Sequence, residues 1–280
     1  MGRSLFKPHR FSRSSPDSGE HPLSDLPLIL ASGLGRSGTT VLRNSLCAHP
    51  QIAGGNFESN YIYDLMRSAD KNLEHKDRVK NMPTSEADYW LRHRQLMLHL
   101  FWPADQLSET TNKLAISTYS MLGPRAAIAL DKSFSRLAIC YIIRNGIEVV
   151  SSYLAFEPFK KMTFEEICRL WALRNDMVNY ARRQRHIFLF RFEWFQTPSK
   201  YKEELTKALA FIGLDYDVQC SAPLETIYHP TVFSGESRKD ASDVSQRKER
   251  WKLWSAEQRQ TFVALCGDAM KFQGYEIPWV

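Results

Sequence analysis

A glycine-rich turn near the start of the chain joins a short apolar run to a helix-like pattern. The run at residues 26–33 has the length of a strand buried on both faces of a parallel sheet, and Leu42 and Leu46 after it are spaced as on one face of a helix. Three glycines in Gly33–Thr40 let successive backbone N–H groups turn inward around an anion, and the helix that follows adds the positive end of its dipole. The sequence therefore predicts a strand, a phosphate-binding loop and a helix.

This loop has the spacing of a Walker A motif but lacks its lysine. Gly33 and Gly38 enclose four residues, and Thr39 stands where the motif requires the lysine that neutralises the β- and γ-phosphates of ATP. The cation lies instead at Arg36, inside the loop. ATP chemistry is disfavoured, although a P-loop kinase of a small metabolite remains an alternative. The residues predicted to hold the phosphate are Gly35, Arg36, Ser37, Gly38, Thr39 and Thr40.

A second candidate anion site follows the apolar run 136–143. Arg144 comes directly after this predicted strand, and Ser152 follows eight residues later on a predicted helix. An arginine at the carboxyl edge of a parallel sheet faces the same crevice as the glycine-rich loop, and it can bind a phosphate through two N–H groups. Together the two sites indicate a nucleotide that carries two separated anionic groups.

The rest of the chain alternates between strand-like and helical patterns. A third apolar run spans 186–191, capping boxes open helices after Thr163 and Ser255, and Pro198 starts a helix that Gly213 ends. The box at Thr163 predicts one long helix reaching Val178. Alternating strands and helices favour an α/β fold. We expect a mobile tail at residues 1–24 and a single α/β domain over 25–280, with residues 216–250 forming a long loop.

Composition excludes several classes of protein and site. The five cysteines are scattered without any C-x-x-C pair, so a disulfide scaffold or a four-cysteine zinc site is disfavoured, as is any metal cofactor. The net charge of +6 is too diffuse to indicate nucleic-acid binding. The sequence has no stretch long and apolar enough for a membrane span and no signal-peptide pattern, so we expect a cytoplasmic protein.

Six motifs in order resemble those of the sulfotransferases that use 3′-phosphoadenosine 5′-phosphosulfate (PAPS), over about residues 27–276. The likeness is nearer to the Golgi-type and bacterial branches, which include tyrosylprotein sulfotransferases. Similar segments are Gly35–Thr40 (the 5′-phosphosulfate loop), Arg144 with Ser152 (the 3′-phosphate pair), Ala48–Gly54, Arg191–Glu193, Ala210–Asp215, and Arg250–Lys252 with Gly274–Tyr275. The resemblance implies a P-loop NTPase-like parallel β-sheet flanked by helices on both faces.

The resemblance also implies roles for further residues. Glu58 falls where tyrosylprotein-type enzymes carry a catalytic glutamate, and Lys113 falls where their lysine lies at the sulfuryl group, although the Asp-Pro that follows that lysine is missing. Arg36 would stabilise charge on the oxygens at sulfur. Phe192 replaces the family's usual tyrosine. The segment Arg250, Trp251 and Lys252 is expected to close over the cofactor.

The predicted activity is in-line transfer of the sulfuryl group from PAPS to an acceptor hydroxyl, without a metal. A carbohydrate acceptor is slightly favoured over peptide tyrosine, lipid or another small molecule, with helix 85–102 and the 216–250 loop as its walls. A non-catalytic module that binds a nucleotide or glycan is a further alternative. The sequence leaves the oligomeric state open.

Overall fold

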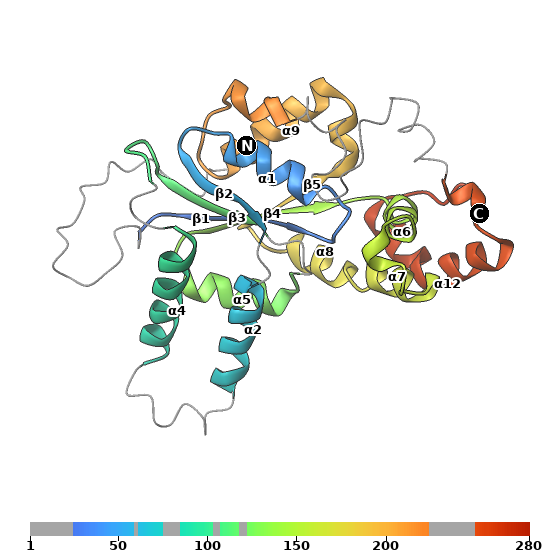
Figure 1. Ribbon diagram of the computed structural model, residues 1–280, viewed down its shortest axis with the longest axis horizontal. Coiled ribbons are helices and arrows are strands. Elements are labelled where there is room, and N and C mark those ends of the chain that lie inside the picture. The colour runs from blue at the N-terminus through green and yellow to red at the C-terminus, as the bar shows by residue number, and fades with distance from the viewer. Residues whose placement is uncertain (1–24, 59–60, 75–84, 103–106, 118–121, 224–249) are drawn as a thin grey trace.

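The computed structural model describes residues 25–58, 61–74, 85–102, 107–117, 122–223 and 250–280. Its centre is a parallel sheet of five strands in the order β2-β3-β1-β4-β5 (Figure 1). The strands are β1 (Leu28–Gly33), β2 (Ile52–Glu58), β3 (Lys113–Ser117), β4 (Leu137–Ile143) and β5 (Ile187–Arg191). The expected α/β class with a parallel sheet is confirmed.

Helices cover both faces of this sheet, as expected (Figure 1). One face carries α1 (Thr39–Cys47) and α9 (Pro198–Phe211), and the other carries α2 (Tyr61–Glu74), α4 (Glu86–Phe101), α5 (Pro124–Ser133) and α8 (Asn175–Ala181). Successive side chains of a strand point to opposite faces, so Leu28 and Leu30 join one core cluster while Ile29 and Ala31 join the other. This two-sided burial explains the continuous apolar runs of the sequence.

A third cluster lies beside the sheet (Figure 1) and is built from α6 (Gly146–Leu154), α7 (Phe164–Ala172) and α12 (Ala256–Gln273). The capping boxes predicted at Thr163 and Ser255 are both present. The single long helix predicted after Thr163 is wrong, because the helix ends at Ala172 and α8 begins at Asn175. This break lets Trp171 pack in the third cluster while Val178 packs under the sheet.

Short elements complete the chain, and two of the strands have weak sequence signals. The 3₁₀ turns are η3 (Glu157–Phe159), η4 (Phe192–Gln196), η5 (Val218–Ser221) and η6 (Arg250–Leu253). The sequence does not predict β2 or β3: β2 is glycine-rich, and β3 has only three consecutive apolar residues, Leu114–Ile116. The expected tail 1–24 and most of the expected loop 216–250 lie outside the described residues. Among the helices that are described, none is long and apolar enough to cross a membrane.

Candidate nucleotide-binding site

The glycine-rich loop lies at the carboxyl edge of the sheet, between β1 and α1. Gly33 pairs with Ile142 of β4, and a Cβ atom at Gly33 would lie 2.5 Å from the Ile142 carbonyl oxygen. Arg36 and Gly38 adopt the left-handed region, with φ angles of 65° and 95°. Alternation of this kind turns successive N–H groups toward one side, which is how backbone nests bind anions. The residue types of the loop therefore support the local geometry predicted for it.

Arg144 follows β4 and reaches this loop directly. Its Nη1 donates to the carbonyl oxygen of Arg36 over 2.8 Å, while its Nε and Nη2 donate to Glu148 over 3.0 and 2.7 Å. The guanidinium lies 4.0 Å from the centre of the Phe192 ring. Phe192 also packs on the loop, since a Cβ atom at Gly38 would lie 2.5 Å from its ring. The structure thus brings Arg144, Phe192 and the loop together.

Arg36 extends from the loop to the helix that carries Ser152. Its Nε donates to the Ser152 hydroxyl over 3.1 Å, and its guanidinium lies 4.3 Å from the centre of the Phe156 ring. The two predicted phosphate sites are therefore linked by this bond and by the bond from Arg144 to the Arg36 carbonyl. Ser37 and Thr39 are buried in the loop, whereas Thr40 is exposed.

The segment Arg250–Lys252 forms η6, which packs against α6. The Trp251 and Trp279 rings have centroids 4.9 Å apart, and the Arg259 guanidinium lies 5.5 Å from the centre of the Trp251 ring. The Lys252 side chain is exposed. The structure places this segment beside the helix of Ser152, but Trp251 packs within the aromatic cluster of the C-terminus.

Lys113 lies at the opposite edge of the sheet. Lys113 precedes Leu114, and Leu114 pairs with Leu28 at the start of β1, whereas the glycine-rich loop begins at the end of β1, at Gly33. At about 3.3 Å per residue along a strand, the backbone of Lys113 is roughly 17–20 Å from the start of the loop. Burial, with a smaller contribution from the nearby charge of Arg136, lowers the pKa of the Lys113 ammonium to about 8. The expectation that Lys113 reaches the sulfuryl group is not supported, because the strand register directs it away from that edge.

His49 shares this amino edge and joins two segments of the chain. Its Nδ1 accepts from the Gln51 backbone N–H over 3.2 Å, so the proton is on Nε2, which donates to the Asp215 carbonyl over 3.2 Å. Burial lowers the pKa of His49. The Ala48–Gly54 and Ala210–Asp215 motifs therefore meet at a neutral histidine that stabilises the fold away from the loop.

Glu58 ends β2 at the same sheet edge as the loop. Its backbone pairs with Ser117, which in turn pairs with Ala31 of β1. Two strand spacings of about 4.8 Å separate β2 from β1. The backbone of Glu58 therefore lies at the same edge as the loop, about two strand spacings from β1.

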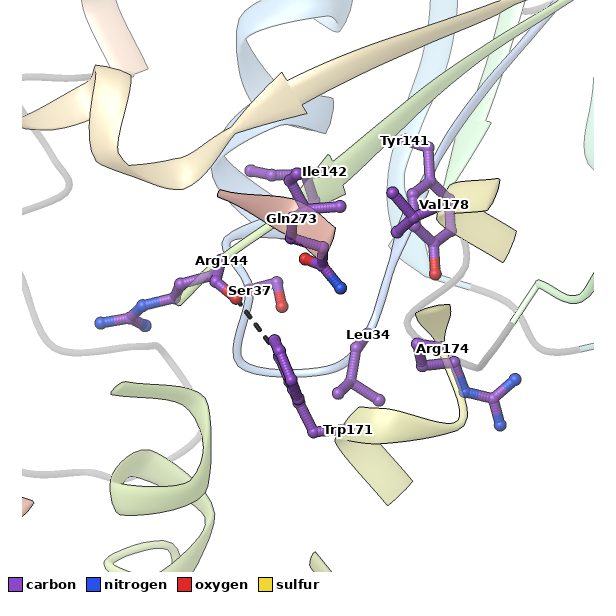
Figure 2. Close-up of a pocket in the computed structure, with 10 residues that line it drawn as sticks. Leu34, Ser37, Tyr141, Ile142, Arg144, Trp171, Arg174, Val178 and Gln273 are labelled. Atoms are coloured by element: carbon purple, nitrogen blue, oxygen red, sulfur yellow. Dashed lines mark hydrogen bonds between the residues drawn. The ribbon is translucent and has the colours of Figure 1, made fainter. Parts of the chain in front are cut away.

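Sequence reasoning missed four residues that hold this site. Glu148 pairs with Arg144, Phe156 contacts Arg36, Trp171 donates to the Arg144 carbonyl over 3.2 Å, and Glu193 accepts from the Asn145 N–H over 2.8 Å. Figure 2 shows Arg144, Trp171 and Ser37 around a small cavity below the loop. Glu148 had a sequence signal in its i,i+4 spacing from Arg144, and Glu193 stood in the Arg191–Glu193 motif without a predicted contact.

No cluster of three or more metal-ligating side chains occurs in the part of the chain that the structure describes. Arg36 and Arg144 place two guanidinium groups at this sheet edge, beside the backbone N–H groups of the loop. Such an arrangement can bind a nucleotide at two phosphate groups and stabilise negative charge that develops between them.

Comparisons with known proteins agree with this geometry. The profile of the Sulfotransferase family matches residues 27–218, and no curated protein matches the chain in sequence. The sulfotransferase domain of the Synechococcus PCC 7002 olefin synthase is similar in structure, with a TM-score of 0.56 and 14% identity over 96% of this chain and 100% of that one. A sulfotransferase from Alicyclobacillus acidocaldarius has a TM-score of 0.50 and 14% identity over 90% and 97%. A mouse sulfotransferase complexed with PAP has a TM-score of 0.50 and 13% identity over 88% and 84%.

Proposed function

The chain belongs to the Sulfotransferase family, and from this premise we propose that it transfers the sulfuryl group of PAPS to an acceptor hydroxyl. The observation that carries the proposal is the contact between Arg144 and the loop, 2.8 Å from Nη1 to the Arg36 carbonyl. It joins the carboxyl ends of two adjacent parallel strands into one anion-binding edge. A donor with phosphate groups at both its 3′ and 5′ positions fits such an edge.

In this mechanism the residues of the chain bind and orient the donor while the acceptor attacks sulfur in line. The acceptor oxygen forms the new S–O bond, the bond from sulfur to the bridging phosphate oxygen breaks, and adenosine 3′,5′-bisphosphate leaves. Loop N–H groups and Arg36 stabilise charge on the departing oxygen, which typically contributes about 10²–10³ in rate. Arg144 and Ser152 hold the 3′-phosphate. Glu58 accepts the proton of the attacking hydroxyl.

The proposed acceptor is a small molecule or carbohydrate that carries a hydroxyl group. Helix α4 was one predicted wall of its site. Three large aromatic residues of that region, Tyr89, Trp90 and Trp102, are buried, each at 3% exposure. They belong to the core and do not form a platform for a sugar ring.

Thermal unfolding with nucleotides tests this proposal. A ligand that binds only the native state raises the unfolding temperature, so we expect adenosine 3′,5′-bisphosphate to stabilise the protein and ATP with Mg²⁺ to do so much less. The reverse ranking would favour a small-metabolite kinase and would contradict the proposal. Transfer of label from ³⁵S-PAPS into a cell extract then separates an enzyme from a module that only binds the nucleotide.

A further inference from the structure

One peptide bond at the site is held from both of its ends. The carbonyl oxygen of Arg144 accepts from Trp171 Nε1 over 3.2 Å (Figure 2), and the N–H of Asn145, which belongs to the same peptide unit, donates to Glu193 Oε1 over 2.8 Å. A peptide unit is planar, so two hydrogen bonds on opposite sides fix the orientation of the whole plane. This orientation sets the direction in which the chain leaves Arg144 for α6.

Trp171 is itself held against the first turn of α6. A Cβ atom at Gly146 would lie 2.8 Å from the Trp171 ring, so only glycine lets the indole approach this closely. Trp171 is buried at 3% exposure. The Trp171 indole, which donates to the Arg144 carbonyl, is therefore fixed in position by its packing.

Glu193 is connected in turn to the C-terminal end of α12. Its second oxygen, Oε2, accepts from the Tyr275 hydroxyl over 3.1 Å. Tyr275 follows the left-handed cap Gly274, its N–H donates to the Met270 carbonyl over 2.9 Å, and the Arg191 guanidinium lies 4.9 Å from its ring centre. A carboxylate that accepts bonds at both oxygens is oriented by both partners. The end of the chain thus reaches Arg144 through Tyr275, Glu193 and the Asn145 amide.

We infer that Glu193, oriented by Tyr275, is a positioning residue that makes the Arg144 site selective for a nucleotide bearing a 3′-phosphate. This inference rests on the proposed function and adds residues from η4 and α12 to the donor site. Phe192 and Glu148 contact the guanidinium itself, whereas Glu193 acts one bond further back, on the peptide from which the side chain is displayed. The arginine side chain is long, so a small rotation of that peptide displaces the guanidinium further than it displaces the backbone atoms.

The experiment compares two nucleotides that differ only in the 3′-phosphate. Calorimetric titration measures the affinities of wild type, Glu193→Ala, Glu193→Gln and Tyr275→Phe for adenosine 3′,5′-bisphosphate and for adenosine 5′-phosphate. We expect Glu193→Ala to weaken the bisphosphate about tenfold and to leave the monophosphate within about twofold. We expect Glu193→Gln to recover most of the loss, since its amide oxygen accepts from Asn145 and its amide nitrogen can donate to the Tyr275 oxygen.

Tyr275→Phe is the milder variant, and it keeps the test informative if Glu193→Ala fails to fold. We expect it to weaken the bisphosphate about threefold. Tyr89→Phe is its matched control: the Tyr89 hydroxyl also donates to an oxygen on another element, the Ala69 carbonyl over 2.9 Å, but between α4 and α2. Tyr89→Phe should leave both affinities unchanged.

Equal losses for the two nucleotides, or no loss in Glu193→Ala and Tyr275→Phe, would overturn the inference and leave Glu193 as a support of the fold only. A wild-type protein that binds the bisphosphate no better than the monophosphate would instead overturn the proposed function. The wild-type titration therefore distinguishes a failure of the proposed function from a failure of the inference about Glu193 before any variant is measured.

Discussion

At the residue scale, Arg144 shows how the fold holds a cation at an anion site. Glu148 engages one side of its guanidinium, the Arg36 carbonyl accepts from Nη1, and the Phe192 ring lies against its face. Glu148 lowers the net charge at this position and orients the guanidinium. An incoming phosphate gains hydrogen bonds from a group that has already lost its conformational freedom, which reduces the entropy cost of binding.

We predict that Arg144→Ala lowers the affinity for adenosine 3′,5′-bisphosphate about 30- to 100-fold and leaves adenosine 5′-phosphate almost unchanged, because a charge-assisted pair of hydrogen bonds is lost. Calorimetric titration with both nucleotides measures the change in affinity. Arg182→Ala is the control, since Arg182 also lies on a ring, that of Phe272 at 4.3 Å, but on α8's C-terminal side. Equal affinity of the wild type for both nucleotides would refute the role of Arg144.

Glu58→Gln removes the proposed base without changing the shape of the side chain. We expect the turnover number to fall about 10²–10⁴-fold, the usual contribution of a general base, with no change in bisphosphate affinity. Single-turnover transfer from ³⁵S-PAPS measures the first quantity and calorimetry the second. Glu86→Gln, on an exposed ion pair with Lys132, is the control. Unchanged turnover in Glu58→Gln would remove the residue from the mechanism.

Lys113 provides a pH-dependent test at the other sheet edge. Its pKa is about 8 in the folded protein, below the ordinary lysine value of 10.5, so between pH 8 and pH 10.5 the unfolded chain binds more protons than the folded one. The contribution of Lys113 to the free energy of unfolding therefore rises with pH across this window. Lys113→Met removes the titrating group, so the variant should have a larger free energy of unfolding than wild type at pH 8. This difference should shrink as the pH rises from 8 to 10.

Urea unfolding of both proteins at several pH values measures this difference. The comparison is needed because other groups with raised pKa values, about 12 for the buried Tyr153 and about 11 for the partly buried Cys47, act in the opposite direction in both proteins. We also expect Lys113→Met to keep sulfuryl transfer within about twofold of wild type, since a residue this far away makes no contact with the donor. A loss of a hundredfold would return Lys113 to the active site.

At the scale of elements, the unit β1–loop–α1 depends on a backbone conformation that few side chains tolerate. Gly38 has φ 95° and touches Phe192, and α1 begins at the next residue. Arg36 is a non-glycine residue in the left-handed region, a strain that is typical of functional sites. The loop is therefore a feature of the element pair, and it cannot be formed by the strand or the helix alone.

Gly38→Ala should lower the free energy of unfolding by about 2–3 kcal/mol and weaken the bisphosphate, because the added methyl group strains the backbone and displaces Phe192. Gly267→Ala is a comparison of opposite sign. Gly267 lies inside α12, where a Cβ atom would meet only Val263 at 3.8 Å, so alanine should stabilise the protein by about 0.5–1 kcal/mol. Chemical denaturation measures both variants, and a neutral Gly38→Ala would show that the loop relaxes freely.

At the scale of the whole molecule, the donor site lies where the three core clusters meet. Phe192 packs with the cluster of α1 and α9, Leu34 with the cluster of α6, α7 and α12, and Ile143 with the cluster under the opposite face of the sheet. A ligand at this edge contacts elements that are otherwise packed in separate units. Nucleotide binding should therefore stabilise the backbone at the carboxyl edge of the sheet and leave the stability of helices away from the site unchanged.

Hydrogen exchange with and without adenosine 3′,5′-bisphosphate tests this distribution. Among amides that exchange through local opening, we expect slower exchange in the loop 33–40 and in the first turn of α6, and no change in α2 and α5. The α2–α5 pair is the reference because it packs on one face of the sheet, whereas α6 lies beside the sheet (Figure 1). Protection centred on α2 and α5 would contradict the placement of the nucleotide.

Local patterns in the sequence were sufficient for the strand–loop–helix unit, for β4 and β5, and for the capping boxes, because these features depend on neighbours within about four residues. The same patterns predicted α7 and α8 as one helix, since periodicity does not report which core a helix face will meet. Motif order was sufficient for the family, because the segments at the loop, at Arg144 and at the chain end recur together.

Tertiary structure alone decided at which edge of the sheet Lys113 lies. Lys113 and Glu58 are both near strands, yet the register of a parallel sheet puts Lys113 at the start of β3 and Glu58 at the end of β2. The contacts of Glu193 with Asn145 and Tyr275 join residues 48 and 82 positions apart. Hydrogen bonds between residues so distant in sequence form only when packing brings the elements together, so no local pattern encodes them.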